Sequence, residues 1–158
     1  MSHKFWPFWH SHKEMDRSRS TQDLVRCSPN NHNAPYVGGM FNKSSCYVHP
    51  GYVHRNIGTT SFGTGYFVQE NNQPVYEHRE YYFLVGGDVS FRPFMQVAEN
   101  LRFKVGCTKQ NRPIYIGTMA INGQELSGPV VDGTCFVNYN GAVYFDKYNY
   151  KILALNEG

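Results

Sequence analysis

The histidines are the side chains best suited to acid–base or metal chemistry in this chain. His10 and His12 lie one residue apart, and His49 and His54 flank a glycine-containing stretch that is typical of a loop. A metal site needs further ligands, and the sequence places no matching cysteine or carboxylate beside either pair. We therefore expect no bound metal, and we expect His49 and His54 to be solvated loop residues.

Other patterns that would indicate catalysis are incomplete. Gly63-Thr64-Gly65 has neither the following Lys-Ser/Thr nor the helix that would hold a phosphate, so it indicates a turn. No Gly-x-Ser-x-Gly elbow occurs, and no set of Ser, His and Asp recurs along the chain. The sequence thus predicts no catalytic residue and no cofactor, and an enzyme is the least supported class of function.

The polar residues of the expected loops are the better candidates for binding a ligand, because loops vary while a sheet holds them in place. In the first half of the chain these candidates are Asn42, Lys43, His54, Arg55 and Asn56. In the second half they are Lys109, Gln110, Asn111, Asn122 and Gln124.

An internal duplication organises the chain around these loops. Residues near position 37 recur 68 positions later as the same or similar types, and most are β-branched or aromatic residues, glycines and asparagines. Such a repeat indicates a small all-β unit present twice. The best-matched pairs are Val37/Val105, Gly38/Gly106, Tyr47/Tyr115, Val48/Ile116, Tyr76/Tyr144 and Tyr82/Tyr150.

The elements expected from this pattern are short strands separated by turns. No segment shows a sustained helical period with caps, so we expect very little helix and two packed sheets. Asn140-Gly141 favours a two-residue hairpin turn, because both residues tolerate a positive φ. We expect strands at residues 24–26, 35–37, 46–49, 66–69, 75–78, 81–85, 89–91, 101–105, 114–119, 135–139, 143–145 and 149–153.

Three segments follow from this: residues 1–22 as a flexible tail, 23–86 as the first repeat and 87–158 as the second. One repeat is too small to bury a sufficient core, so the two should share one compact, sandwich-like domain. The tail contains Phe5, Trp6, Phe8 and Trp9, which could fold back on the body, insert at a membrane interface or anchor a partner. Its hydroxyl residues near two arginines, Ser18, Ser20 and Thr21, are candidate phosphorylation sites.

Charge and targeting signals narrow the partners and the compartment. The tail has four basic and two acidic residues, so most of the net charge of +3 lies there and the remainder of the chain is almost neutral. A neutral body does not suit a polyanion, and we expect no nucleic acid. No signal peptide or apolar spanning segment is visible, which predicts a cytoplasmic protein with reduced cysteines.

The second half resembles a known family. Its segments Arg112-Pro113-Ile114-Tyr115-Ile116-Gly117 and Cys135-Phe136-Val137-Asn138-Tyr139-Asn140-Gly141 are similar to the DM-nine domain, a tandem β-repeat of insect and mollusc proteins and natterin-like toxins. Ser45-Cys46-Tyr47-Val48 and Tyr82-Phe83-Leu84-Val85 resemble the first copy. The resemblance implies a pair of β-repeats, often dimeric, and in some members a mannose-binding lectin of innate defence.

The sequence departs from that family where its lectins bind mannose. The acidic position falls at Met40 and Thr108, and the lysine position at Thr59 or Ser61 and at Pro129. These side chains do not supply the carboxylate and cation that usually hold vicinal sugar hydroxyls. We therefore expect a non-catalytic intracellular binding or interaction module with a glycan or protein ligand. The alternatives are a lectin with a rearranged site and, third, an enzyme.

Overall fold

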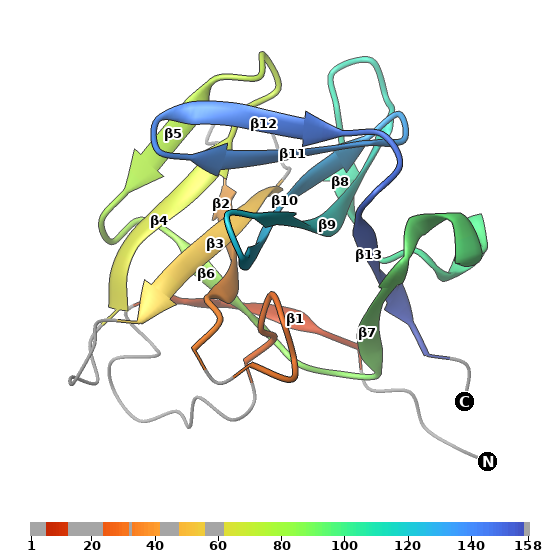
Figure 1. The fold of residues 1–158 in the computed structure, drawn as a ribbon, viewed down its shortest axis with the longest axis horizontal. Helices are drawn as coiled ribbons and strands as arrows, with labels where there is room; N and C mark the ends of the chain where they lie inside the picture. Colours follow the sequence, from red (N-terminus) through yellow and green to blue (C-terminus); the bar gives the residue numbers. More distant parts are fainter. Residues whose placement is uncertain (1–5, 13–23, 32, 42–47, 56–61, 157–158) are drawn as a thin grey trace.

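The computed structural model describes residues 6–12, 24–31, 33–41, 48–55 and 62–156. These residues form two antiparallel sheets, one of six strands and one of seven, packed into a compact sandwich (Figure 1). The expectation of an all-β, sandwich-like domain is confirmed. None of the helices among these residues is long and apolar enough to cross a membrane.

The six-stranded sheet, here called sheet A, is built from the first half of the chain. Its strands lie in the order β1-β6-β2-β3-β4-β5. Their bounds are β1 (Phe8–Ser11), β2 (Tyr36–Phe41), β3 (Val48–Arg55), β4 (Phe62–Val68), β5 (Pro74–Glu77) and β6 (Tyr82–Val85).

The seven-stranded sheet, sheet B, is built from the second half. Its main path is β12-β11-β10-β9-β13-β7, and β8 pairs with β9 beside this path. The bounds are β7 (Val89–Pro93), β8 (Lys104–Cys107), β9 (Pro113–Ile121), β10 (Gln124–Val131), β11 (Thr134–Tyr139), β12 (Ala142–Asp146) and β13 (Lys151–Leu155). Two short 3-10 helices, Phe94–Gln96 and Glu99–Leu101, follow β7.

The N-terminal segment differs from the expected flexible tail over residues Phe8–Ser11. These residues form β1, which pairs antiparallel with β6 and aligns Trp9 with Leu84. Trp9 packs against the main core cluster, whereas Trp6 and Phe8 are largely exposed. β1 thus pairs with β6 in sheet A as β7 pairs with β13 in sheet B. Of the three alternatives for the tail, this part of it folds back on the body.

Most expected strands are present, with three differences. Residues 24–26 make only isolated bridges, from Leu24 to Val85 and from Arg26 to Tyr36. Residues 101–105 are divided between the end of a 3-10 helix and the start of β8. β10 was not expected, because Ser127-Gly128-Pro129 interrupts the alternation of apolar and polar residues that marks a half-buried strand.

Close packing of sheet A depends on Phe67 and the glycines around its ring. A Cβ atom added to Gly38 or Gly65 would lie 3.3 or 2.6 Å from that ring. At Gly51 an added Cβ would meet the ring at 2.5 Å and also the backbone carbonyl oxygen of Tyr66. Glycine at these positions leaves room for the Phe67 ring on its own strand β4 and lets the two neighbouring strands β2 and β3 approach it.

Buried polar groups join the two sheets. The Ser127 hydroxyl on β10 donates a 2.5 Å hydrogen bond to the Gly51 carbonyl on β3 and accepts one from the Cys27 thiol at 3.1 Å. Burial raises the pKa of that thiol to about 12, so it keeps its proton. Asn138 Nδ2 donates to the carbonyls of Phe67 and Val75, at 3.1 and 3.2 Å. These bonds fix sheet B against β3, β4 and β5.

The described cysteines Cys27, Cys107 and Cys135 are free thiols, and Cys46 lies outside the described residues. The turn at Asn140-Gly141 agrees with its prediction, since φ is 52° and 78° at the two residues. Asn122-Gly123 and Asp132-Gly133 make two-residue turns with nearly the same angles. Sheet B therefore runs from β9 to β12 through three tight hairpins.

Candidate functional site

Two hairpin turns of the same shape form the candidate site. In residues 69–73 the Gln69 N–H donates to the Gln73 carbonyl, and the Asn72 N–H donates to the Gln69 carbonyl. In residues 108–112 the Thr108 N–H donates to the Arg112 carbonyl, and the Asn111 N–H donates to the Thr108 carbonyl. The fourth residue is an asparagine with φ near 60° in both turns, 61° at Asn72 and 64° at Asn111. This is a type I turn followed by a left-handed residue, which asparagine tolerates.

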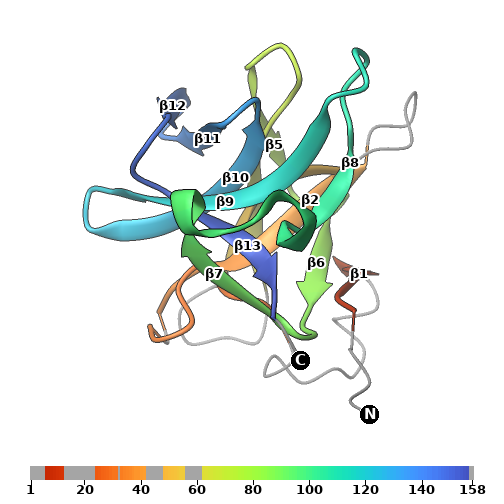
Figure 2. The same ribbon diagram turned by 90° about the vertical axis from the view of Figure 1, so that its right-hand side faces the viewer.

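The two turns come from different sheets but meet at one end of the molecule. The β4–β5 turn and the β8–β9 turn stand side by side in both views (Figures 1 and 2). The Lys109 backbone N–H donates a 3.2 Å hydrogen bond to Glu70 Oε1, so the second residues of the two turns are directly joined. The sandwich is thereby closed by polar turns at this end.

A cavity of about 430 Å³ lies beneath these turns. That volume falls within the range of about 300–1,000 Å³ that is usual for small-molecule sites. Its apolar lining is Val68, Ile114, Pro129, Val131 and Phe136. Its polar lining is His49, Gln69, Glu70, Asn72, Thr108, Gln110, Arg112, Asp132 and Thr134.

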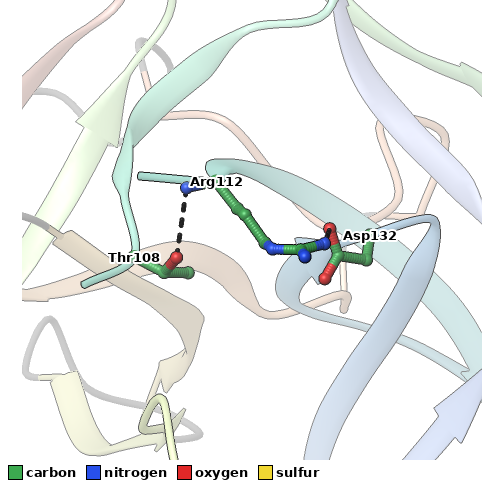
Figure 3. Close-up of polar contacts among 3 residues, drawn as sticks. All are labelled: Thr108, Arg112 and Asp132. Carbon is green, nitrogen blue, oxygen red and sulfur yellow. Dashed lines mark hydrogen bonds and ion pairs between the residues drawn. The ribbon is translucent and has the colours of Figure 1, made fainter. Parts of the chain in front are cut away.

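An ion pair lies at the rim of the cavity. Arg112 Nη1 is 2.8 Å from Asp132 Oδ1, and both side chains are more than half exposed. The Arg112 backbone N–H also donates to Thr108 Oγ1 at 3.2 Å (Figure 3). An exposed pair of this kind contributes little to stability, about 0–1 kcal/mol. Because both side chains are exposed, a ligand can reach the Asp132 carboxylate and the Arg112 guanidinium.

His49 lies in the wall of the cavity, where its expected place in a strand is confirmed but its expected exposure to solvent is wrong. The residue is part of β3, 3% exposed, aligned with Met40 of β2. Burial lowers the pKa of its imidazole, while the nearby Glu70 carboxylate acts in the opposite direction. Because the desolvation of the charged form dominates, His49 contributes a neutral imidazole at neutral pH.

The arrangement suits an uncharged ligand that carries several hydroxyl groups. Vicinal hydroxyls both donate and accept hydrogen bonds, and the rim offers carboxylates, a guanidinium, amides and a threonine hydroxyl. The apolar wall suits the C–H face of a ring. Within the described part of the chain no three His, Cys, Asp or Glu residues are grouped so that they could hold a metal ion.

Some of the predicted second-half residues lie at this site. Lys109, Gln110 and Asn111 belong to the β8–β9 turn, and Gln110 lines the cavity. Asn122 is in the β9–β10 turn and Gln124 begins β10. The β8–β9 turn and the β9–β10 turn lie at opposite ends of β9 (Figure 2). Asn122 and Gln124 are therefore separated from the cavity by the length of that strand.

The first-half candidates do not gather at the cavity. His54 and Arg55 are in β3 rather than in a loop, which corrects their predicted position. The His54 ring packs edge-on against Tyr52 and Tyr66, and burial lowers its pKa. The other candidates lie outside the described residues: Asn42, Lys43, Asn56 and the phosphorylation candidates Ser18, Ser20 and Thr21.

Several residues of the cavity were missed by sequence reasoning, notably Glu70, Arg112, Asp132 and Phe136. One signal was available in the two five-residue segments 69–73 and 108–112, which share asparagine at the fourth position. Asp132-Gly133 is likewise a recognisable turn dipeptide. Their meeting could not be read from the sequence, because the segments belong to different sheets.

The positions where the DM-nine lectins carry their acidic residue and lysine, Thr108 and Pro129 in the second half, both line the cavity. Met40, the corresponding first-half residue, is instead buried in the core cluster of sheet A. In the second half a cation and a carboxylate are nevertheless present close by in the chain, as Arg112 and Asp132.

A larger cavity, of about 570 Å³, lies where the two halves join, between residues 24–29 and 85–91. Its polar side chains make contacts within the fold. Arg26 Nη2 is 3.4 Å from Tyr36 Oη and stacks on that ring, and the Ser90 hydroxyl donates to Asn156 Oδ1 at 2.7 Å. The polar side chains of Arg26 and Ser90 are thus bonded to Tyr36 and Asn156, which do not line this cavity.

Comparison with known proteins identifies a similar fold. The chain superimposes on the crystal structure of the nematode sperm cell motility protein MFP2B with a TM-score of 0.59 and 14% sequence identity. The match covers 89% of this chain and 42% of that protein, so the chain spans less than half of its neighbour. At this identity the likeness concerns the fold alone.

No protein-family model matches the chain, and no curated protein matches it. The coarse part of the family resemblance, a β-rich sandwich, is supported by the structural neighbour. Membership of the DM-nine family itself stays a prediction.

Proposed function

We propose that the protein is a non-catalytic binding module whose ligand is a neutral polyhydroxylated ring, such as a sugar, held in the turn cavity. The observation behind this proposal is the accessible Arg112–Asp132 pair at the rim of a cavity with one apolar wall. A carboxylate that accepts hydrogen bonds and a guanidinium that donates them suit adjacent hydroxyl groups, and such charge-assisted bonds are the strong ones.

The family resemblance supports the same ligand class by a different route. Thr108 and Pro129 replace the acidic residue and lysine of the mannose-binding lectins, and both replacements border the cavity. Arg112 is four residues after Thr108, and Asp132 is three residues after Pro129. The proposal is a rearranged site in which the cation follows the former acidic position and the carboxylate follows the former lysine position, so that the two charges exchange places beside the ligand.

The contacts of the two carboxylates favour binding over catalysis. Glu70 accepts a hydrogen bond from the Lys109 backbone, and Asp132 pairs with Arg112. Both groups act as hydrogen-bond acceptors with a fixed partner, which suits the positioning of a ligand. An enzyme remains the third hypothesis, and it predicts that a bound sugar is consumed.

Titration of the purified protein with D-mannose, after a survey on a glycan array, tests the proposal. We expect saturable binding that weakens at least tenfold in Arg112→Ala and in Asp132→Asn. Gln124→Ala is the matched control, because Gln124 is an exposed polar residue at the far end of β9. The absence of any bound glycan, or equal weakening by the control, contradicts the proposal. Recovery of altered sugar would favour the enzyme instead.

A further inference from the structure

We propose that the turn cavity continues into a second subsite formed by the aromatic pair Phe136 and Phe145, so that the ligand is an oligosaccharide rather than a single sugar. This inference rests on the proposed function and adds to it the length of the ligand. It concerns a surface that no sequence motif indicated.

Strand register places Phe145 on the cavity side of sheet B. Phe136 on β11 lines the cavity, and Phe145 on β12 is its direct cross-strand partner. Partners in an antiparallel pair project to the same face of a sheet. The two rings are neighbours, with centroids 6.4 Å apart and planes inclined at 42°. The aromatic surface therefore begins inside the cavity and extends outward onto the edge strand.

Exposure distinguishes Phe145 from a core residue. Its side chain is 64% exposed, whereas Phe136 is half-buried. β12 is the last strand of the main path of sheet B, so no further strand of the described chain pairs beyond it there. Phe136 and Phe145 together place an aromatic wall beside a polar cavity, and ligand sites usually combine such walls with a few polar groups.

The chemistry of the pair suits a second sugar ring. The face of an aromatic ring is the negative part of its quadrupole, and the C–H groups on one face of a pyranose are apolar and weakly positive. One ring of the ligand would bind among Arg112, Asp132 and Thr108, and the next would stack on Phe145. An aromatic platform gives affinity with little dependence on hydroxyl stereochemistry, while the polar cavity selects the first ring.

Alternation along β12 provides a matched control. Tyr144 precedes Phe145 and projects to the opposite face, where its ring packs edge-on against Tyr139 with centroids 5.7 Å apart. Tyr144 is also 45% exposed. Phe145→Ala and Tyr144→Ala thus remove similar exposed rings from one strand, but only the first faces the cavity.

The experiment is a calorimetric titration of each variant with D-mannose and with a linear mannotriose. In the unaltered protein we expect the triose to bind more tightly than the monosaccharide. In Phe145→Ala the affinity for the triose should fall roughly threefold to tenfold, to that of the monosaccharide, with no change for D-mannose. Phe145→Tyr should retain the tighter binding, and Tyr144→Ala should leave both affinities unchanged.

The outcomes separate the two proposals. If both sugars bind with equal affinity, or if Phe145→Ala and Tyr144→Ala act alike on the triose, the second subsite is refuted and the cavity site stands. If Phe145→Ala weakens both sugars equally, the ring belongs to the first site and the subsite is again refuted. If neither sugar binds, the proposed function and the subsite fail together.

Discussion

In the described residues between Val48 and Tyr82, the first half of the chain has one strand fewer than the second half has between Ile116 and Tyr150. Sheet A passes from β3 through β4 to β5, whereas sheet B passes from β9 through β10 and β11 to β12. The sequence repeat aligns Val48 of β3 with Ile116 of β9 and Tyr82 of β6 with Tyr150 just before β13. The extra strand is therefore accommodated within a repeat of nearly constant length.

The described turns of the two halves also differ in length. In the second half Asn122-Gly123 and Asp132-Gly133 make two-residue turns, and each lets the chain reverse immediately. In the first half the turn at residues 69–73 is longer. Within the described residues, the half with the shorter turns thus has the additional strand. A repeat in sequence fixes the kind of unit but not its number of strands.

The additional strand has two consequences for function. β10 packs on β3 and donates the Ser127 hydrogen bond to the Gly51 carbonyl across the sandwich. It also contributes Pro129 and Val131 to the cavity, and the turn that follows it contributes Asp132. The asymmetry between the halves therefore creates both the interface and one wall of the candidate site.

The largest effect that we expect from this comparison concerns Phe67 and Cys135, which are 68 residues apart and both fully buried. Phe67→Ala should lower the free energy of unfolding by about 3–5 kcal/mol, because the ring fills the space over three glycines. Cys135→Ala removes one sulfur atom and should cost about 1 kcal/mol. Urea unfolding measures both values. Equal losses would show that the two cores are equivalent despite their different strands.

A smaller difference in the loss of unfolding free energy is expected between variants of Asn138 and Glu70, which are also 68 residues apart. Asn138→Ala removes two buried hydrogen bonds between the sheets and should cost about 2 kcal/mol. Glu70→Ala removes one exposed hydrogen bond and should cost less than about 1 kcal/mol. Thermal or urea unfolding of the two variants provides the test. A larger loss for Glu70 would mean that the turns, rather than the buried amide, hold the sheets together.

The smallest effect that we expect is a dependence of the free energy of unfolding on pH that comes from the first half of the chain, since all seven histidines lie within residues 3–78. Burial lowers the folded-state pKa of His49 and His54, so the unfolded state binds protons more readily than the folded state. Their contribution to stability is complete above the ordinary histidine pKa of 6.5 and is lost as the pH falls towards the lowered values. Unfolding measured between pH 7 and pH 5 should show this decline.

The control for that prediction is His49→Gln, which should flatten the decline while reducing stability at pH 7 only moderately. An unchanged slope in this variant, with the decline still present, would assign the effect to other groups. Replacement of His54 by Gln should flatten the slope as well, because its pKa is lowered by burial alone.

Local sequence was sufficient for much of the fold. The strands expected at 75–78, 135–139 and 143–145 match β5, β11 and β12 closely, and the turn at Asn140-Gly141 has the predicted positive φ values. These segments combine alternating apolar residues with turn residues that tolerate the positive φ a tight hairpin requires. The residues of β1 were expected in the tail because residues 1–22 differ in composition from the rest of the chain, and their strand conformation depends on pairing with β6.

The candidate site was less accessible to such reasoning. Lys109, Gln110 and Asn111 were expected to bind a ligand because a polar turn is visible in the sequence; they form the β8–β9 turn, and Gln110 lines the cavity. Glu70 lies 39 residues earlier in the chain, yet it accepts a hydrogen bond from the Lys109 backbone. His54 was expected in a loop, although β3 extends through it and packs its ring against two tyrosines.

The amino-acid sequence by itself determined that this protein is built from β-hairpins in two related halves, because side-chain alternation and turn residues act over a few neighbouring positions. The tertiary structure alone decided which turns meet, where β1 and β10 pair, and which side chains line a common cavity. Those outcomes depend on the packing of one sheet against the other. Contacts such as Phe67 over Gly38 and Gly51 join residues that no local pattern relates.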